Sequence, residues 1–139
     1  MALKVSEVLV RALEYWGKDG EYWVKKELVE EGSVCLVGGL SESIGGATYL
    51  EEMENCWPLA DRRVYIQAMR YVYKALVHGT AAARAMPARD IDVETALLQF
   101  NDHDSTTFKD VRGVVCSALK QALADEAEES TANNGDDND

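Results

Sequence analysis

The sequence lacks an apolar run long enough to cross a membrane, and it lacks the dense, even cysteines of an extracellular disulfide scaffold. No window approaches the roughly 18 apolar residues that a membrane span needs, and no basic segment leads into an apolar run as in an export signal. The three cysteines are odd in number, widely spaced and set among apolar neighbours, which favours thiols in a reducing compartment. We therefore expect a cytoplasmic protein with no membrane partner.

Positive charge is also scarce, because 14 Lys and Arg residues face 25 Asp and Glu residues, for a net charge of −11. Seven of the acidic residues lie in the last fifteen positions, where there is no Lys or Arg, and subtracting them leaves −4 for residues 1–124. An acidic surface repels phosphate backbones instead of releasing their counterions. Direct binding to nucleic acid is therefore disfavoured.

Motifs for metal and nucleotide binding are absent. The two histidines and three cysteines show neither Cys-x-x-Cys nor His at positions i and i+4. Asp102-x-Asp104 is too short for a calcium loop, and the Gly38-Gly39 and Gly45-Gly46 pairs lack the Lys, Ser or Thr pattern of a phosphate loop. The sequence therefore predicts no bound metal and no cofactor.

Apolar residues recur at helical spacing in several segments. Ser6 is the expected N-cap of the first helix and Gly17 its stop, while Thr107 and Asp110 form an acidic capping box for the last helix. Segment 19–32 fits either a helix or a short hairpin around Gly32-Ser33. The spacing predicts helices over 6–16, 34–44, 59–78, about 90–100 and 107–125, a helical turn within 48–56, and a short helix or ordered loop over 80–89.

These elements predict a mainly α protein, a compact bundle of about four to five helices with room for one small β-hairpin near residues 24–36. The length favours one folded domain over residues 1–124. Residues 125–139 are rich in Glu, Ser, Asn and Asp and carry little apolar area to offset the entropy of ordering. We expect them to form a disordered acidic tail.

The residues that could carry out chemistry have two interpretations, a catalytic one and a structural one. Cys35 could act as a thiol nucleophile with His103 as its base and Asp102 as the orienting carboxylate, since such groups meet only in the fold. A cysteine between Val and Leu is more often a small buried hydrophobe, and Asn101-Asp102 most simply fixes a turn. Packing is therefore the favoured reading of both features. It is also favoured for Gly38 and for the aromatic cluster Tyr15, Trp16, Tyr22 and Trp23, although exposed aromatic residues are the usual anchors of an interface.

Three short motifs resemble a small domain of unknown function found in actinobacteria and their phages. They are Gly20-x-x-Trp23-x-Lys25, then Gly32-x-x-Cys35-Leu36-x-Gly38-Gly39-Leu40, and Phe100-Asn101-Asp102 leading into Thr107-x-x-Asp110-Val111. The similarity spans residues 6–124, but Gly39 stands where alanine is usual, and residues 47–57 contain an insertion. The resemblance implies extended or hairpin structure at 24–34 and supplies no activity. From these motifs, Trp23, Gly38, Asn101 and Asp102 are the candidate binding residues.

Our leading hypothesis is a non-enzymatic accessory protein that binds a host or cellular protein. The resemblance implies a phage or actinobacterial origin, and therefore a host cytoplasm if a phage encodes the chain. The first alternative is a small-molecule-binding or thiol-dependent enzyme that uses Cys35 with Asp102 or His103. The second is an acidic mimic of nucleic acid. The pattern gives no preference for an oligomeric state.

Overall fold

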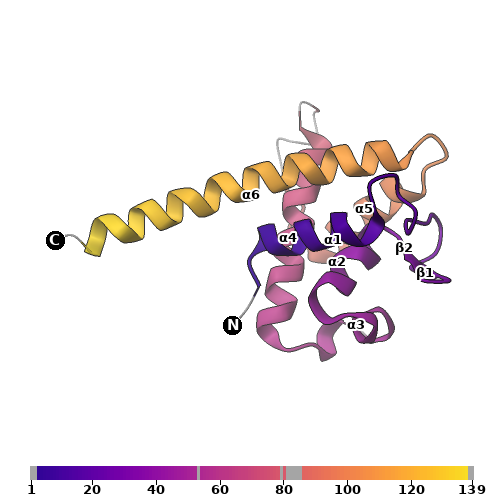
Figure 1. Ribbon diagram of the computed structural model, residues 1–139, viewed down its shortest axis with the longest axis horizontal. Coiled ribbons are helices and arrows are strands. Elements are labelled where there is room, and N and C mark those ends of the chain that lie inside the picture. Colours follow the sequence, from indigo (N-terminus) through magenta and orange to yellow (C-terminus); the bar gives the residue numbers. More distant parts are fainter. Residues whose placement is uncertain (1–2, 53, 79, 81–85, 138–139) are drawn as a thin grey trace.

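Six α-helices, one 3₁₀ turn and one two-stranded sheet make up the part of the chain that the computed structural model describes, residues 3–52, 54–78, 80 and 86–137 (Figure 1). The prediction of a mainly α fold with one small hairpin is confirmed. About four to five helices were expected, and the short helix over 47–51 falls where a helical turn was predicted within 48–56. The elements are α1 (Val5–Trp16), β1 (Val29–Glu30), β2 (Ser33–Val34), α2 (Leu36–Gly45), α3 (Ala47–Glu51), the 3₁₀ turn Glu54–Cys56, α4 (Leu59–Val77), α5 (Asp90–Asp102) and α6 (Phe108–Asp137).

Helix α1 begins at Val5, and the prediction of Ser6 as its N-cap is wrong. The capping position belongs to Lys4, whose backbone N–H donates to the Glu7 carboxylate at 3.0 Å. Ser6 lies inside the first turn, where it is buried and its hydroxyl donates to Glu126 of α6 at 2.6 Å. A long-range partner thus takes the hydroxyl that local capping would use. The helix ends as expected at Gly17, whose φ is 83°.

The ambiguous segment before α2 contains a β-hairpin. Strands β1 and β2 pair antiparallel, with Val29 opposite Val34 and Glu30 opposite Ser33. The two residues between them, Glu31 and Gly32, have φ values of 47° and 86°, and a positive φ at both central residues is the mark of a type I′ turn. On the other side of β2, Trp23 pairs with Val34 in a parallel bridge. The hairpin contacts the helices through β2, which packs against α2.

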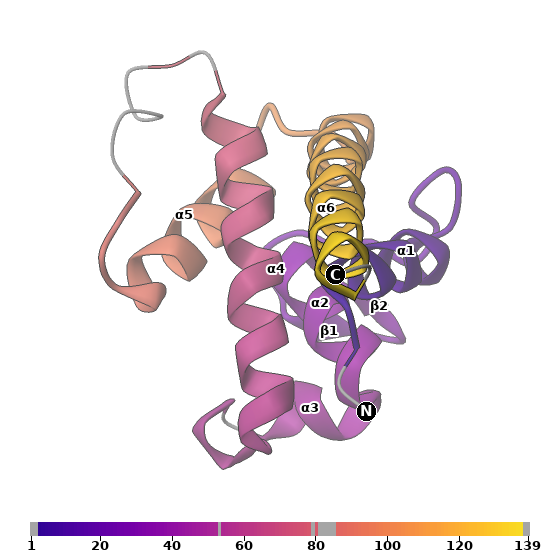
Figure 2. The same ribbon diagram turned by 90° about the vertical axis from the view of Figure 1, so that its left-hand side faces the viewer.

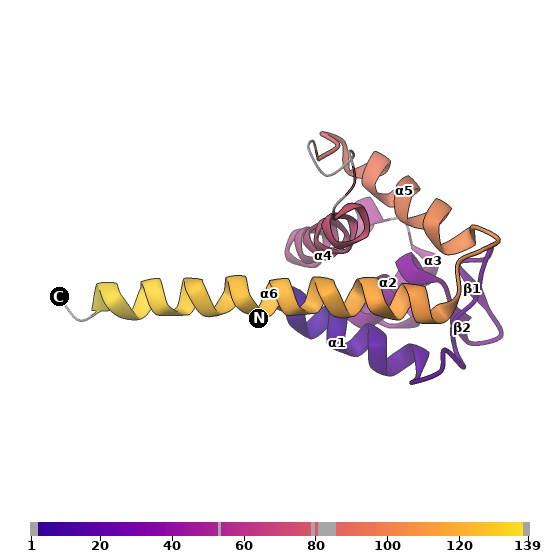
Figure 3. The ribbon, with the colours of Figure 1, turned by 90° about the horizontal axis from the view of Figure 1, so that it is seen from above.

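Helix α6 lies between α1 on one side and α4 on the other (Figures 2 and 3). Helix α2 packs against α1, α4 and α5, and it forms the floor of the same core. Five of the six described helices present buried apolar residues to this core at three- and four-residue intervals, as an amphipathic helix must to bury one face. The short helix α3 has no buried residue. The largest fully buried side chains include Trp16, Leu9, Leu36, Leu40, Met69, Leu97, Val111 and Val115.

The last helix extends further than the sequence predicted. Instead of ending near residue 125, α6 continues to Asp137 and projects from the bundle (Figures 1 and 3). Its first extra residues belong to the body, because Asp125 and Glu126 accept hydrogen bonds from Tyr71 and Ser6. The remainder adds residues to a helix that is already nucleated, which avoids the main cost of helix formation.

The expected element at 80–89 falls largely on residues 81–85, which lie outside the described residues. On either side of them, α4 ends at Val77 and α5 begins at Asp90, both within one or two residues of the predicted bounds. Over the described ranges, no helix is both long and apolar enough to cross a membrane.

Candidate functional site

The family motifs meet at the side chain of Asn101, which is fully buried at the end of α5. Its Oδ1 accepts hydrogen bonds from Trp23 Nε1 at 2.7 Å and from the Leu36 amide at 3.0 Å. Its Nδ2 donates to the Val24 carbonyl at 3.1 Å and to Asp102 Oδ1 at 3.0 Å. One amide therefore ties the segment before the hairpin, the start of α2 and the end of α5 to each other.

Asp102 holds the loop that precedes the hairpin. Its Oδ1 accepts a hydrogen bond from the Lys26 amide at 2.7 Å, and Lys26 has a φ of 65°, which a non-glycine residue rarely adopts. The neighbouring Lys25 ammonium donates to the carbonyls of His103 at 2.8 Å and Asp104 at 3.3 Å. The Asx pair therefore fixes a distant backbone segment, whereas no hydrogen bond from either side chain to the turn after α5 is found among the described residues.

Cys35 does not meet His103 in a catalytic arrangement. The thiol is the N-cap of α2, accepting a hydrogen bond from the Gly38 amide at 3.3 Å, and only 1% of the residue is exposed. Burial raises the pKa of the Cys35 thiol, and the negative charge of Asp102 raises it further, which opposes thiolate formation. His103 Nδ1 is 3.1 Å from the Ser105 amide that donates to it and 2.8 Å from the Ser105 hydroxyl. The geometry favours a structural role for both residues.

Gly38 and Gly39 allow close packing at the start of α2. A Cβ at Gly38 would lie 2.6 Å from the Leu28 carbonyl oxygen, and one at Gly39 would overlap the Trp16 ring. Any larger residue would push the hairpin or α1 away from α2. The candidate binding residues thus lie at one contact between α2, α5 and the segment before the hairpin, and its hydrogen bonds are made within the chain. We call this contact the Asn101 joint; it contains Trp23, Gly38, Asn101 and Asp102.

Beyond this joint, the hairpin presents apolar side chains to solvent. Tyr22, Leu28 and Val29 are 51%, 40% and 43% exposed, and they are three of seven large hydrophobic residues that are exposed in the described part of the chain. We call these three residues the hairpin surface. The hairpin lies at the end of the molecule opposite the tip of α6 (Figure 1).

The backbone that carries the hairpin surface is held from several sides. The Val34 amide donates to the Tyr22 carbonyl at 2.8 Å, and the Cys35 amide donates to the Leu28 carbonyl at 3.2 Å. The Tyr15 hydroxyl donates to the Gly32 carbonyl in the turn at 2.5 Å. A surface fixed in this way has less conformational entropy to lose when a partner binds.

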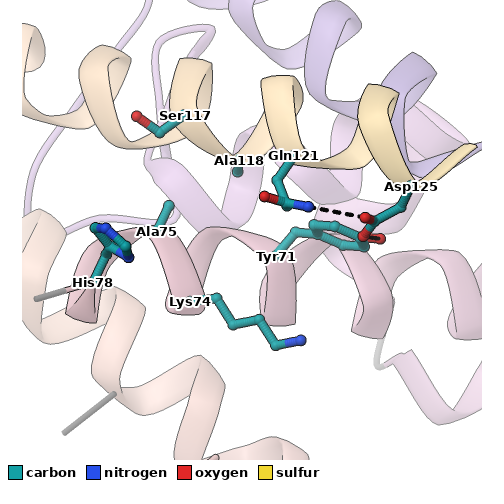
Figure 4. A pocket seen from close by; sticks show the side chains of 8 residues that line it. All are labelled: Tyr71, Lys74, Ala75, His78, Ser117, Ala118, Gln121 and Asp125. Atoms are coloured by element: carbon teal, nitrogen blue, oxygen red, sulfur yellow. Dashed lines mark hydrogen bonds between the residues drawn. The ribbon is translucent and has the colours of Figure 1, made fainter. Parts of the chain in front are cut away.

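A second candidate site is an open pocket of about 480 Å³ between α4 and α6 (Figure 4). Asp125 accepts hydrogen bonds from the Tyr71 hydroxyl at 2.5 Å and from Gln121 Nε2 at 2.9 Å. Lys74, His78 and Ser117 also line the pocket, but in the described part of the chain their side chains make no hydrogen bond. The lining residues are Tyr71, Lys74, Ala75, His78, Ser117, Ala118, Gln121 and Asp125.

The Tyr71–Asp125 bond sets the electrostatics of this pocket. It lowers the pKa of Asp125, and it raises the pKa of Tyr71 to about 12. Because the carboxyl pKa is depressed on folding, the bond contributes stability at neutral pH, and that contribution is lost only as the pH falls through the folded-state pKa. At neutral pH the acid is therefore charged and already satisfied by two donors.

The pocket continues along α6 toward its N-terminus. A neighbouring hollow shares Ala75 and Ser117 with it and extends to Phe100, Lys109 and Gly113. We call the two hollows together the α4–α6 groove. Sequence reasoning missed this groove, although a glycine within a predicted helix, Gly113, was a signal that close approach to α6 is permitted.

No group of three or more His, Cys, Asp and Glu side chains in the described ranges is placed to hold a metal ion.

Comparison with known proteins gives a family and no activity. No curated protein and no solved structure matches the chain. A family model described as a family of unknown function (DUF6197) matches residues 1–121, which include every residue of the Asn101 joint and the hairpin. The chain therefore belongs to this family of unknown function.

Proposed function

We propose that the chain is a non-enzymatic accessory protein that binds another protein through the hairpin surface. The observation that carries this proposal is the exposure of Tyr22, Leu28 and Val29. The backbone between Tyr22 and Leu28 is fixed by hydrogen bonds from Val24 to Asn101 and from Lys26 to Asp102. Interfaces obtain most of their binding energy from a few aromatic and aliphatic anchors, and they bind more tightly when those anchors are ordered in advance.

The charges around the hairpin surface define the kind of partner. Glu21, Glu27, Glu30 and Glu31 are exposed within the same segment, while the Lys25 and Lys26 side chains are directed to groups after α5. An acidic rim around apolar anchors fits a partner with an apolar pocket and basic residues at its edge. The resemblance to actinobacterial and phage proteins supports a partner in the cytoplasm of such a host.

The test is a pull-down from actinobacterial lysate with three forms of the full chain. Wild type should retain a partner that the double variant Tyr22→Ser/Val29→Ser loses. The matched control is Leu59→Ser/Ile91→Ser, which removes two apolar side chains that are 59% and 55% exposed on other elements. The control should retain the partner.

Two results would contradict the proposal. One is a partner that the hairpin variant and wild type retain equally. The other is the absence of any retained protein together with a measurable small-molecule ligand. Circular dichroism spectra of the variants should match that of wild type, because the substituted side chains are exposed.

A further inference from the structure

The floor of the α4–α6 groove leaves open space beside α6 at Gly113. A Cβ built on Gly113 meets no atom within 4 Å, so no packing within the described residues requires a glycine there. Ala75, Ser117 and Ala118 are the small residues beside it. Small residues along a helix allow the backbone of another helix to approach closely.

The rim of the groove carries two lysines, whose charges act on the nearby Asp125 and Asp110 without a direct ion pair in the described residues. Lys74 and Lys109 line the groove, and neither makes an ion pair or a side-chain hydrogen bond within the described residues. The acids beside them already have donors: Asp125 has Tyr71 and Gln121, and Asp110 accepts from the Thr107 amide at 2.9 Å. An acidic helix would find both lysines available.

The same chain carries such a helix. Beyond Glu126, α6 projects away from the body as far as Asp137 (Figure 3). Residues 127–137 contain four acidic residues and no Lys or Arg. At a rise of about 1.5 Å per residue this extension is about 15 Å long, and the α6 residues that line the groove, 109–125, span about 24 Å.

We propose that the α4–α6 groove of one chain receives the projecting end of α6 from a second copy, and that the two contacts close a symmetric dimer. If the two α6 helices run antiparallel with their twofold axis near residue 125, residues 128 and 129 of one copy lie near Lys74 of the other. The same register sets position 137 of one copy opposite position 113 of the other, about one helical turn from Lys109. Each groove then holds the extension of the partner, so the contact is isologous and the assembly ends at two chains.

Sedimentation velocity at low ionic strength tests the dimer with the full-length chain. Wild type should shift from monomer to dimer mass as its concentration rises, and added salt should weaken the association because exposed charge pairs are screened. Lys74→Glu/Lys109→Glu and Glu128→Lys/Glu129→Lys should each weaken the dimer about tenfold or more. Gly113→Leu should also weaken it, without any change of charge.

The decisive arm mixes the two charge-reversed variants. In an equimolar mixture, one groove of the heterodimer pairs unchanged lysines with an unchanged extension. In the other groove, the reversed position 74 meets the reversed positions 128 and 129, so the heterodimer should form more tightly than either variant associates with itself. The matched control is Arg112→Glu/Lys120→Glu, which makes the same change of charge at exposed α6 positions outside the groove and should dimerise as wild type does. A chain that stays monomeric at every concentration would overturn the proposal. So would a dimer that ignores both reversals, or a mixture that fails to associate.

Discussion

The side chain of Asn101 uses both ends of its amide in a place that water does not reach. Two donors converge on Oδ1 and two acceptors receive Nδ2, and these four partners come from Trp23, Val24, Leu36 and Asp102. A carboxylate could not donate, and a shorter side chain could not span the three segments. The buried network therefore explains why an aromatic-Asn-Asp motif, a Trp motif and a Cys-Leu motif occur in one chain.

Replacing Asn101 with alanine should destabilise the fold. The change leaves the half-buried Trp23 indole and the buried Leu36 amide without an acceptor, and the loss of an acceptor for a buried donor costs about 1–3 kcal/mol. We expect the free energy of unfolding to fall by about 2–4 kcal/mol in urea denaturation. The control is Gln67→Ala, since Gln67 is exposed on α4 and should change stability by less than about 0.5 kcal/mol. Equal stability of the two variants would show that the network contributes nothing.

Helix α6 contains an element-scale anomaly at Gly113. Glycine in a helix interior costs roughly 0.5–1 kcal/mol relative to alanine, because it loses more backbone entropy on folding. In this chain a Cβ at the position would enter open space, so no steric gain offsets that cost. The residue is therefore suboptimal for the isolated helix.

Gly113→Ala should stabilise the monomer. We expect an increase of about 0.5–1 kcal/mol in the free energy of unfolding, measured at a concentration where the chain is monomeric. Gly39→Ala serves as the opposite control, because its Cβ would overlap the Trp16 ring and should destabilise the fold. Loss of stability in Gly113→Ala would mean that a close neighbour within the chain already occupies this space.

Local periodicity predicted most of the elements, because their apolar spacing and stops agree with the packing. The beginning of α6 follows from the Thr107–Asp110 capping box, whose hydrogen bonds are present, and α4 begins directly after Pro58. The hairpin could not be derived from spacing alone, since Glu31 occupies the first central position of a type I′ turn, where Asn, Asp or Gly is usual. Local sequence predicts Ser6 as a cap, because the hydroxyl's actual partner, Glu126, lies 120 residues away and cannot be seen from neighbouring residues.

The candidate sites were less predictable than the fold, for a reason that concerns the whole molecule. The motif residues were recognised, but only the fold shows that they turn inward to one joint and leave Tyr22, Leu28 and Val29 outward. The groove depends on the angle between α4 and α6, which no local pattern encodes. The end of the body likewise depends on contacts, because Asp125 and Glu126 are anchored by residues of other helices.

Amide hydrogen exchange in dilute, monomeric solution should locate that end. We expect slow exchange for α6 amides up to residue 126, where the helix packs against α1 and α4, and fast exchange from about residue 130, where its hydrogen bonds face solvent. Ser6→Ala should accelerate exchange around Glu126 by removing the hydroxyl that donates to its carboxylate, whereas Ser130→Ala on the projecting part should leave it unchanged. If residues 125 and 126 instead exchange as fast as residue 130 in wild type, the anchoring bonds do not hold in solution. The folded domain would then end near residue 124, as the composition predicts, because the hydrogen bonds from Tyr71 and Ser6 would not stabilise residues 125 and 126.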